Sequence, residues 1–338
     1  MPRITISDIA RRAGVSTGAV SYALNDRPGV SEQTRARILA IADELGWQPS
    51  SAARSLSGSR SETVGMVLAR DPDTLGVESF YMQFLAGIEL ELSKRSYALL
   101  LQVVPDLDAE LRTHRAWRAA RRVDGVIIID PRVDDPRLPA FQLPDALPAV
   151  VVGDTSLAGG LTNVWTDDAA AVRESVRYLY AMGHRRIARI SGVADFGHTT
   201  IRDRAFDEEI AAVGAEGLVA RTDYSPVQGA GVTRAVLTLA DRPSAIIYDN
   251  DVMAVAGLGV AAEVGLRVPE DVSMVAWDDS PLCEATFPRL TALSHDVKKY
   301  GAHVARRLFD RIDGAEPGSF LDSVPTLRAR GTTARHAG

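Results

Sequence analysis

Residues 5–25 read TISDIARRAGVSTGAVSYALN, and this stretch predicts two short helices joined by a turn of only a few residues. Thr5, with Asp8 three residues later, forms the pattern of a capping box for a first helix that ends at Gly14. Ser16 can cap a second helix, Thr17 to Leu24. This spacing is typical of a helix-turn-helix, whose second helix enters the major groove of DNA.

A third helix is expected after Ser31, whose hydroxyl can cap it. Its apolar residues Ile38, Ile41 and Leu45 share one face, and Gly46 marks its end. Residues 1–48 are therefore predicted to form a small all-α DNA-binding domain.

Residues 49–61 are rich in Ser and Gly and mark a domain boundary. Ser50 is a possible N-cap and Gly58 a possible C-terminal stop, so a helix of one to two turns is predicted from Ala52 to Leu56. So short a helix is only marginally stable in water, because helix nucleation is costly. We expect residues 49–61 to be a linker with a short hinge helix.

From residue 62 onward, apolar segments of strand length alternate with amphipathic helical segments. This alternation is typical of parallel sheets covered by helices on both faces. The expected strands are 64–69, 98–104, 125–130, 149–153, 187–191, 245–248 and 272–277. The expected helices are near 82–96, 107–122, 169–182, 202–213, 229–240, 251–264 and 297–312. Residues 62–338 exceed the usual size of one such sheet, so two doubly wound α/β lobes with a cleft between them are predicted.

The chain has 338 residues and a formal charge of 38 − 44 = −6, which seems unsuited to DNA. However, residues 1–60 hold eight Arg and no Lys against five acidic residues, a net charge of +3. The single cysteine, Cys283, cannot form an internal disulfide, and no apolar run reaches the length of a membrane span. Apolar character also breaks too early at the N-terminus for a signal peptide. These features favour a cytoplasmic protein that does not enter a membrane.

Several separated segments resemble the lactose-repressor-type (LacI/GalR) family of transcriptional regulators. The matching segments are 5–10, 13–16, 20–25, 30–35, 53–56, 183–188, 250–254, 268–273, 278–282 and 330–333. The resemblance spans nearly the whole chain and implies a DNA-binding head, a hinge helix and a core like that of periplasmic sugar-binding proteins. It also implies a homodimer on a near-palindromic operator, most often acting as a repressor.

The exposed face of the second helix is expected to carry Thr17, Gly18, Ser21 and Tyr22. Thr17 and Tyr22 can contact base edges, whereas Gly18 has no side chain with which to read a base. The polar residues expected at phosphates or helix ends are Ser16, Ser21, Asn25 and Ser31. For Ser16, capping and phosphate contact can hold together.

In the hinge, the resemblance assigns Leu56 as an apolar wedge in the minor groove, the alternative being a Leu that simply covers the core. Ala53 would allow two hinge helices to approach closely. The hinge helix is also the segment expected to fold and unfold with the ligand state of the core.

In the core, the family matches point to Arg202, Asp251 and Asp278 as ligand contacts, a set that suits a sugar or another polyol. The possible apolar walls of the ligand site, for which core packing is the alternative, are Phe80, Tyr81, Trp165 and Trp277. The chain departs from the family pattern at residues 77–80 (VESF) and 202–206 (RDRAF). Because of the second departure, Arg204 is an alternative to Arg202, with a surface salt bridge as its other explanation.

An enzyme and an exported solute-binding protein are the competing functions. Asp278 and Asp279 are adjacent, and side chains of adjacent strand residues point to opposite faces, so they are not expected to form an acid/base pair. The histidines show no metal-ligand spacing, and neither a P-loop nor a nucleophile elbow is present. We therefore expect no catalytic residue, metal or cofactor. No heptad repeat follows Gly331, so a dimer is expected rather than a tetramer.

Overall fold

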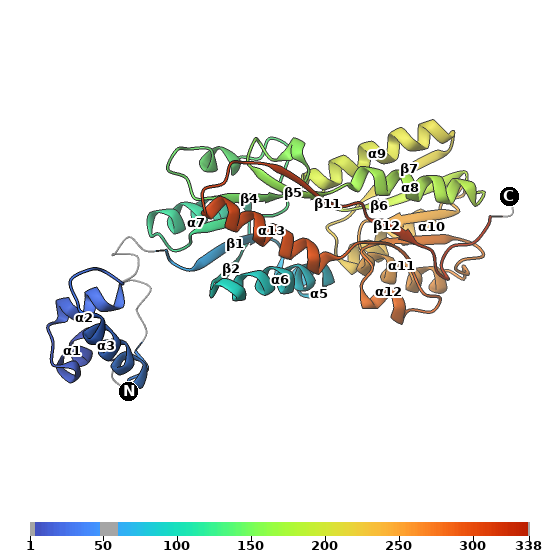
Figure 1. Cartoon of the computed structure of the whole chain (residues 1–338). Helices are drawn as coiled ribbons and strands as arrows, with labels where there is room; N and C mark the ends of the chain where they lie inside the picture. Colours follow the sequence, from blue (N-terminus) through green and yellow to red (C-terminus); the bar gives the residue numbers. More distant parts are fainter. Residues whose placement is uncertain (1–3, 48–59, 337–338) are drawn as a thin grey trace. The chain divides into compact units, whose positions relative to one another are not determined.

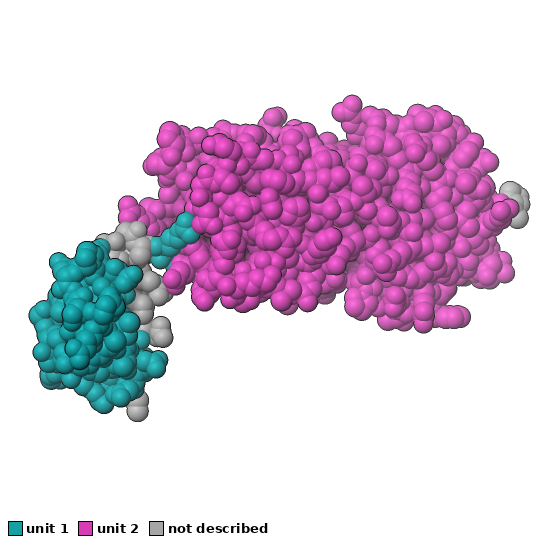
Figure 2. Space-filling view, viewed as in Figure 1, with its two compact units in different colours: residues 1–61 teal, residues 62–338 magenta. Residues whose placement is uncertain are grey.

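The computed structural model describes residues 4–47 and 60–336, and the chain divides into two compact units, residues 1–61 and 62–338 (Figure 2). The described part of unit 1 contains three helices, α1 (Ile6–Ala13), α2 (Thr17–Leu24) and α3 (Glu32–Glu44). Ile9, Val20 and Ile38, one from each helix, are completely buried at its centre. The three predicted helices and their inward faces are confirmed.

Short polar side chains cap the N-terminal ends of these helices, as predicted. The backbone N–H and the hydroxyl of Thr5 both donate to the Asp8 carboxylate, at 3.0 and 2.7 Å. The Ser16 hydroxyl accepts the backbone N–H of Ala19 at 3.1 Å, and the Ser31 hydroxyl accepts that of Thr34 at 3.3 Å. At the start of each helix, a side-chain oxygen therefore accepts a backbone N–H that has no partner within the helix.

Unit 2 contains two six-stranded sheets (Figure 1). The first sheet is parallel throughout and defines lobe 1, with strand order β11-β5-β4-β3-β1-β2. Its strands are β1 (Thr63–Ala69), β2 (Ala98–Val104), β3 (Gly125–Ile128), β4 (Ala149–Val152), β5 (Thr162–Thr166) and β11 (Ser319–Ser323). Its helices are α5 (Pro72–Val77), α6 (Ser79–Leu92), η1 (Ser93–Arg95), α7 (Leu107–Ala119), η2 (Leu138–Phe141), η3 (Thr155–Leu157) and α13 (Val297–Ile312).

The second sheet defines lobe 2, with strand order β12-β10-β9-β8-β6-β7, in which only β12 is antiparallel to its neighbour. Its strands are β6 (Arg186–Ser191), β7 (Glu216–Arg221), β8 (Ala245–Tyr248), β9 (Ser273–Trp277), β10 (Thr291–Ser294) and β12 (Thr326–Arg328). Its helices are α8 (Asp168–Ala181), α9 (Gly197–Val213), α10 (Pro226–Leu237), α11 (Asp251–Glu263) and α12 (Pro281–Ala285).

Helices cover both faces of each sheet, which explains the continuous apolar strands. In lobe 1, α6 and α13 cover one face of the sheet, and Trp117 of α7 packs on the other. In lobe 2, α10 and α11 cover one face, and α8 and α9 cover the other. The predicted pair of doubly wound lobes is confirmed. No helix within the described ranges is both long enough and apolar enough to cross a bilayer.

The chain crosses between the lobes three times, after β5, after β10 and after β11. As a result α13 and β11, which come late in the sequence, complete lobe 1. In Figure 1, α13 lies beside α6. A Cβ atom added to Gly87 of α6 would lie 1.9 Å from the carbonyl oxygen of Lys298, and one added to Gly301 would lie 2.1 Å from that of Phe84. Only glycine allows the two backbones to approach so closely.

Besides the short 3-10 helices η2 and η3, five strands and two α-helices escaped the prediction. They are β5, β7, β10, β11, β12, α5 and α12. β7, β11 and β12 lie at sheet edges and carry exposed polar residues, while polar residues interrupt the apolar sequence of the interior strands β5 and β10. In addition, α9 begins at Gly197, earlier than the predicted residue 202. Edge strands lack the continuous apolar character on which the prediction depended.

Candidate functional site

A cavity of about 130 Å³ lies between the two lobes of unit 2. Most of its wall comes from residues at the carboxyl ends of parallel strands, where ligands bind in open α/β sheets. The five residues predicted to contact a ligand all line it: Phe80, Arg202, Asp251, Trp277 and Asp278. Further lining residues include Arg70, Glu78, Tyr81, Asp130, Asp168, His198, Tyr224, Asp249, Asn250 and His295.

Trp165, which was also considered as an apolar wall, is not part of the cavity lining. Its neighbours in β5 explain this, because Val164 is completely buried in the lobe 1 core and Thr166 lines the cavity. Side chains alternate along a strand, so Trp165 points to the other face of the sheet from both. The expectation for Trp165 is therefore wrong, whereas Tyr81 does line the cavity.

Arg202 is the arginine that faces the cavity. Its Nε donates to Asp168 Oδ2 at 2.8 Å, and its guanidinium carbon lies 3.5 Å from the centre of the Trp277 ring. Burial opposes its charge, but the carboxylates of Asp168 and Asp249 raise the pKa of Arg202 above its ordinary value. In contrast, the Arg204 side chain is 82% exposed and pairs with Glu208 at 2.8 Å. The surface salt bridge considered for Arg204 is thus what the structure shows.

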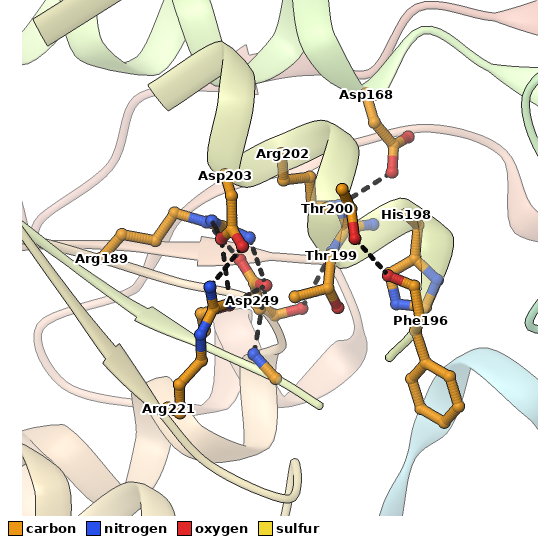
Figure 3. A network of polar contacts seen from close by, with 12 residues as sticks. Asp168, Arg189, Phe196, His198, Thr199, Thr200, Arg202, Asp203, Arg221 and Asp249 are labelled. Atoms are coloured by element: carbon orange, nitrogen blue, oxygen red, sulfur yellow. Dashed lines mark hydrogen bonds and ion pairs between the residues drawn. The ribbon is translucent and has the colours of Figure 1, made fainter. Parts of the chain in front are cut away.

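A buried network in lobe 2 fixes the end of β8 beside the cavity (Figure 3). The completely buried Arg189 donates to the Asp249 carboxylate from Nε at 2.8 Å and from Nη2 at 2.6 Å. Arg189 and Arg221 both contact the carboxylate of Asp203 on α9. Because Asp249 is held in this way, the next two residues along the chain are placed at the cavity wall.

The first of these is Asn250, which joins the two lobes. Its Oδ1 accepts the backbone N–H of Met253 at 2.8 Å and so caps α11. Its Nδ2 donates to the Tyr224 carbonyl at 3.0 Å and to Glu78 Oε1, across the cleft in lobe 1, at 3.3 Å. A single amide therefore starts a helix in lobe 2 and binds a carboxylate of lobe 1.

Arg70 makes a second connection between the lobes. Its Nε donates to Asp130 Oδ2 at 3.0 Å, and the Tyr81 hydroxyl donates to the same oxygen at 2.9 Å. The guanidinium carbon of Arg70 also lies 4.4 Å from the ring centre of Phe196 and 5.2 Å from that of Tyr224, both in lobe 2. Burial opposes ionisation of Asp130, but Arg70 holds the pKa of this carboxyl below its usual value.

Glu78 is a cavity residue that the sequence analysis missed. It is 8% exposed, and its Oε2 has no hydrogen-bond partner among the described residues. Burial raises the pKa of Glu78 to about 7. The only signal in the sequence was the departure from the family pattern at residues 77–80, which gave no reason to select the glutamate.

Asp251 and Asp278 place two more carboxylates at this cavity. Asp251 is buried, and within the described residues its Oδ2 has no hydrogen-bond partner. Burial, together with the charge of Asp278, raises the pKa of Asp251 to about 6. Asp279 instead pairs with Arg330, Nη1 to Oδ1 at 2.7 Å, so the two adjacent carboxylates have separate partners.

Two histidines also line the cavity, although neither was selected from the sequence. His198 Nε2 lies 2.8 Å from the Tyr224 hydroxyl, and burial lowers the pKa of His198 to about 4, so its imidazole is neutral at pH 7. His295 Nε2 lies 3.8 Å from Asp278 Oδ1, and His295 Nδ1 has no hydrogen-bond partner among the described residues. Residues 4–47 and 60–336 contain no group of three or more His, Cys, Asp or Glu side chains that could hold a metal ion.

In unit 1, helix α2 presents a polar face. Thr17 and Gly18 are exposed and Tyr22 is 45% exposed, while Val20 and Ala23 on the other side are buried in the three-helix core. Asn25 ends the helix, with its Nδ2 donating to the Ser21 carbonyl at 2.8 Å. Ala53 and Leu56 lie outside the described residues.

A helix-turn-helix unit joined to a two-lobed α/β body with an interlobe cavity defines the class of DNA-binding regulators controlled by a ligand. Residues 5–50 match the family described as bacterial regulatory proteins of the lacI family, and residues 176–333 match a periplasmic binding protein-like domain. The chain belongs to the LacI family of bacterial transcriptional regulators.

Individual relatives cover almost the whole chain. The transcriptional regulator CelR of Thermobifida fusca is 33% identical over 318 residues, which cover 92% of this chain and 93% of CelR. A solved complex of CelR with cellobiose has a TM-score of 0.74 and 30% identity, covering 98% of this chain and all of that one. The lac repressor dimer bound to operator and the anti-inducer ONPF has a TM-score of 0.85 and 25% identity, covering 98% and 99%.

Proposed function

We propose that this protein is a transcriptional repressor that binds a palindromic operator as a homodimer and is controlled by a sugar or related polyol in the interlobe cavity. One observation carries the proposal: Arg202, stacked on Trp277, and the carboxylates of Glu78 and Asp251 meet in one cavity formed by both lobes. Planar guanidinium and carboxylate groups beside an aromatic ring suit a ligand with many hydroxyls. The relative CelR, solved with cellobiose, supports the same class of ligand.

The DNA-reading surface that we propose is the exposed face of α2. Thr17 and Tyr22 would contact base edges, and Gly18 would leave its position without direct readout. Ser16, Asn25 and Ser31 occupy helix ends in the structure, which is compatible with additional phosphate contacts. Part of the positive charge of unit 1 is used internally, since Arg12 pairs with Glu44 and Arg35 with Asp26.

The hinge supplies the rest of the proposed DNA contact. Leu56 would enter the minor groove at a central, easily kinked base step, and Ala53 would face the second hinge helix. A ligand that favours one arrangement of the lobes would change the separation of the two hinge helices and hence operator affinity. The change in operator binding free energy cannot exceed the ligand's preference for one arrangement over the other.

Exposed apolar side chains support the proposed homodimer. They lie on α5, α6 and β2 of lobe 1 and on or just after α12 of lobe 2, along the lower side of unit 2 in Figure 1. They are Val77, Met82, Leu90, Leu101, Val103, Leu282 and Phe287. Exposed apolar side chains on neighbouring elements suit a surface that becomes buried in an interface. A twofold-symmetric body would hold two helix-turn-helix units for two half-sites, with the protein acting in the cytoplasm.

The experiment that tests this function begins with selection of an operator from a randomised DNA pool by the full chain. We expect a symmetric site, and in fluorescence anisotropy we expect at least one neutral sugar to change operator affinity tenfold or more. Asp278→Asn should retain operator binding and weaken the sugar response. A solute-binding protein or an enzyme would select no operator, and an asymmetric site bound by a monomer would overturn the proposal.

A further inference from the structure

The cavity carries a large excess of negative charge. Its lining contains eight carboxylates and only two cationic side chains, Arg70 and Arg202. The carboxylates are Glu78, Asp130, Asp154, Asp167, Asp168, Asp249, Asp251 and Asp278. Five of the eight have a clear structural use, since Asp130, Asp168 and Asp249 pair with arginines, Asp167 caps α8 and Asp154 caps η3. The negative charge of the remaining carboxylates therefore faces any ligand that enters the cavity.

Both cavity arginines already hold a carboxylate. The Arg70 guanidinium is bound to Asp130 and packed among aromatic rings. Arg202 is bound to Asp168, also donates to the Asp249 carbonyl at 3.4 Å, and its guanidinium carbon lies over the Trp277 ring. An anionic ligand would therefore have to compete with carboxylates that are already in place and already hydrogen-bonded.

Glu78 and Asp251 are the carboxylates that could accept a further hydrogen bond from a ligand. Each is more than nine-tenths buried, each lines the cavity, and each has one oxygen without a hydrogen-bond partner among the described residues. One belongs to lobe 1 and the other to lobe 2. A buried carboxylate oxygen left without a donor is costly, so a ligand that donates to both would favour the arrangement in which the lobes are close.

We infer that the cavity selects its ligand by charge: it binds an uncharged sugar through hydroxyl donors to Glu78 and Asp251, and it rejects sugars that bear a phosphate or carboxylate group. Glu78 and Asp251 are the residues that determine this specificity. The inference rests on the proposed function, which names a sugar or polyol without specifying its charge. Hydroxyl groups donate to carboxylates, whereas an added anion meets like charge at short range in a poorly solvated site.

The test compares matched pairs of probes on the full chain by titration calorimetry. A panel of neutral mono- and disaccharides, including glucose and cellobiose, is paired with anionic counterparts such as glucose 6-phosphate and cellobionic acid. We expect the neutral member of a binding pair to bind at least tenfold more tightly. In Glu78→Gln and Asp251→Asn this ratio, measured at pH 8, should fall by at least threefold. Both carboxyls are ionised above their pKa values of about 7 and about 6, so each substitution then removes one negative charge and keeps the shape of the side chain.

Glu174→Gln is the matched control, since it removes an exposed charge from α8 away from the cavity lining, and its ratio should equal that of the unaltered protein. Anionic probes that bind as tightly as their neutral partners, a panel with no neutral binder, or an unchanged ratio in both cavity variants would each overturn the inference. Operator binding is measured on the same samples. If it persists while the charge preference fails, only this inference is wrong; if it is absent, the proposed function is wrong.

Discussion

Glu78 shows how one side chain at the cleft couples the protonation state of the protein to its stability. Burial raises the pKa of its carboxyl to about 7 from an ordinary value of 4.5. The folded state therefore holds this proton more tightly than the unfolded state. The stabilisation is fully present below pH 4.5 and is lost as the pH rises through about 7. Its size is at most roughly 3–4 kcal/mol, since one pKa unit corresponds to about 1.4 kcal/mol.

We accordingly expect Glu78→Gln to change the pH dependence of unfolding. Gln cannot ionise, and its oxygen can still accept the hydrogen bond from Asn250. The melting temperature of the variant minus that of the unaltered protein should be more positive at pH 8 than at pH 5. Thermal melts of the full chain at these two pH values measure the difference. A difference that stays constant with pH would contradict the prediction.

Arg202 and Arg204 form a matched pair for a test of buried charge. Arg202→Ala would leave Asp168 buried without its cationic partner, and we expect a loss of about 3–5 kcal/mol in the free energy of unfolding. Arg204→Ala removes only an exposed salt bridge and should change stability by about 0.5 kcal/mol or less. Urea unfolding of both variants makes the comparison, and equal losses would show that the two arginines are not distinguished by burial.

These residues also show what the sequence could and could not predict about the site. Asp251 and Asp278 were predicted because each falls in a segment that resembles the family, and Arg202 because it keeps the arginine of a segment that otherwise departs from the family pattern. Glu78 was missed because its environment is created by tertiary structure: its partner Asn250 lies 172 positions away in the sequence. A glutamate is usually solvated, and no local pattern distinguishes one that a second lobe will bury.

At the scale of helices and strands, the packing of α6 against α13 depends on two glycines. Gly87→Ala or Gly301→Ala would place a Cβ atom about 2 Å from a backbone carbonyl oxygen of the other helix, so the helices would have to separate. We expect each substitution to destabilise unit 2 by about 2 kcal/mol or more, as overpacking against backbone does.

Gly259→Ala is the control for this pair. It lies within α11, and no atom comes within 4 Å of where its Cβ would be placed. Alanine should be tolerated there and should stabilise the protein by about 0.5–1 kcal/mol, because glycine is a poor helix former. Chemical denaturation of the three variants would contradict this account if Gly87→Ala and Gly259→Ala shifted stability in the same direction.

Continuous apolar sequence, rather than burial, decided which strands were predicted: β2 is largely exposed but apolar in sequence, whereas β5 and β10 are mostly buried and were missed. β3, β4, β8 and β9 are buried along their whole length and read as continuous apolar runs. β7 and β11 are not, because each has only one neighbour in its sheet and exposes polar side chains. The number of lobes could thus be predicted from the central strands alone, whereas the full set of strands required the structure.

At the scale of the whole molecule, the homodimer is the property most open to a direct test. Met82 on α6 is 68% exposed and lies within the apolar surface proposed for the interface. Met82→Asp should shift sedimentation from dimer to monomer and lower operator affinity at least a hundredfold, because two half-sites would no longer be bound together. Leu143→Asp, at an exposed position between η2 and β4, should change neither quantity. An unaltered protein that sediments as a monomer would overturn the proposal.

The three crossings between the lobes have a consequence for how the chain is made. A ribosome releases β1 to β5 and α6 early, but α13, which covers Phe84 and Ile88 of α6, follows only after nearly all of lobe 2. During synthesis the apolar surface of lobe 1 therefore stays exposed until α13 emerges. At that point lobe 2 lacks only β12. Most of lobe 1 comes first in the sequence, but the lobe is not complete until β11 has been translated. Lobe 1 therefore does not follow the usual order, in which the N-terminal part of a chain folds first. A nascent chain stalled before residue 297 should need protection by chaperones, and one stalled well after residue 323 should not.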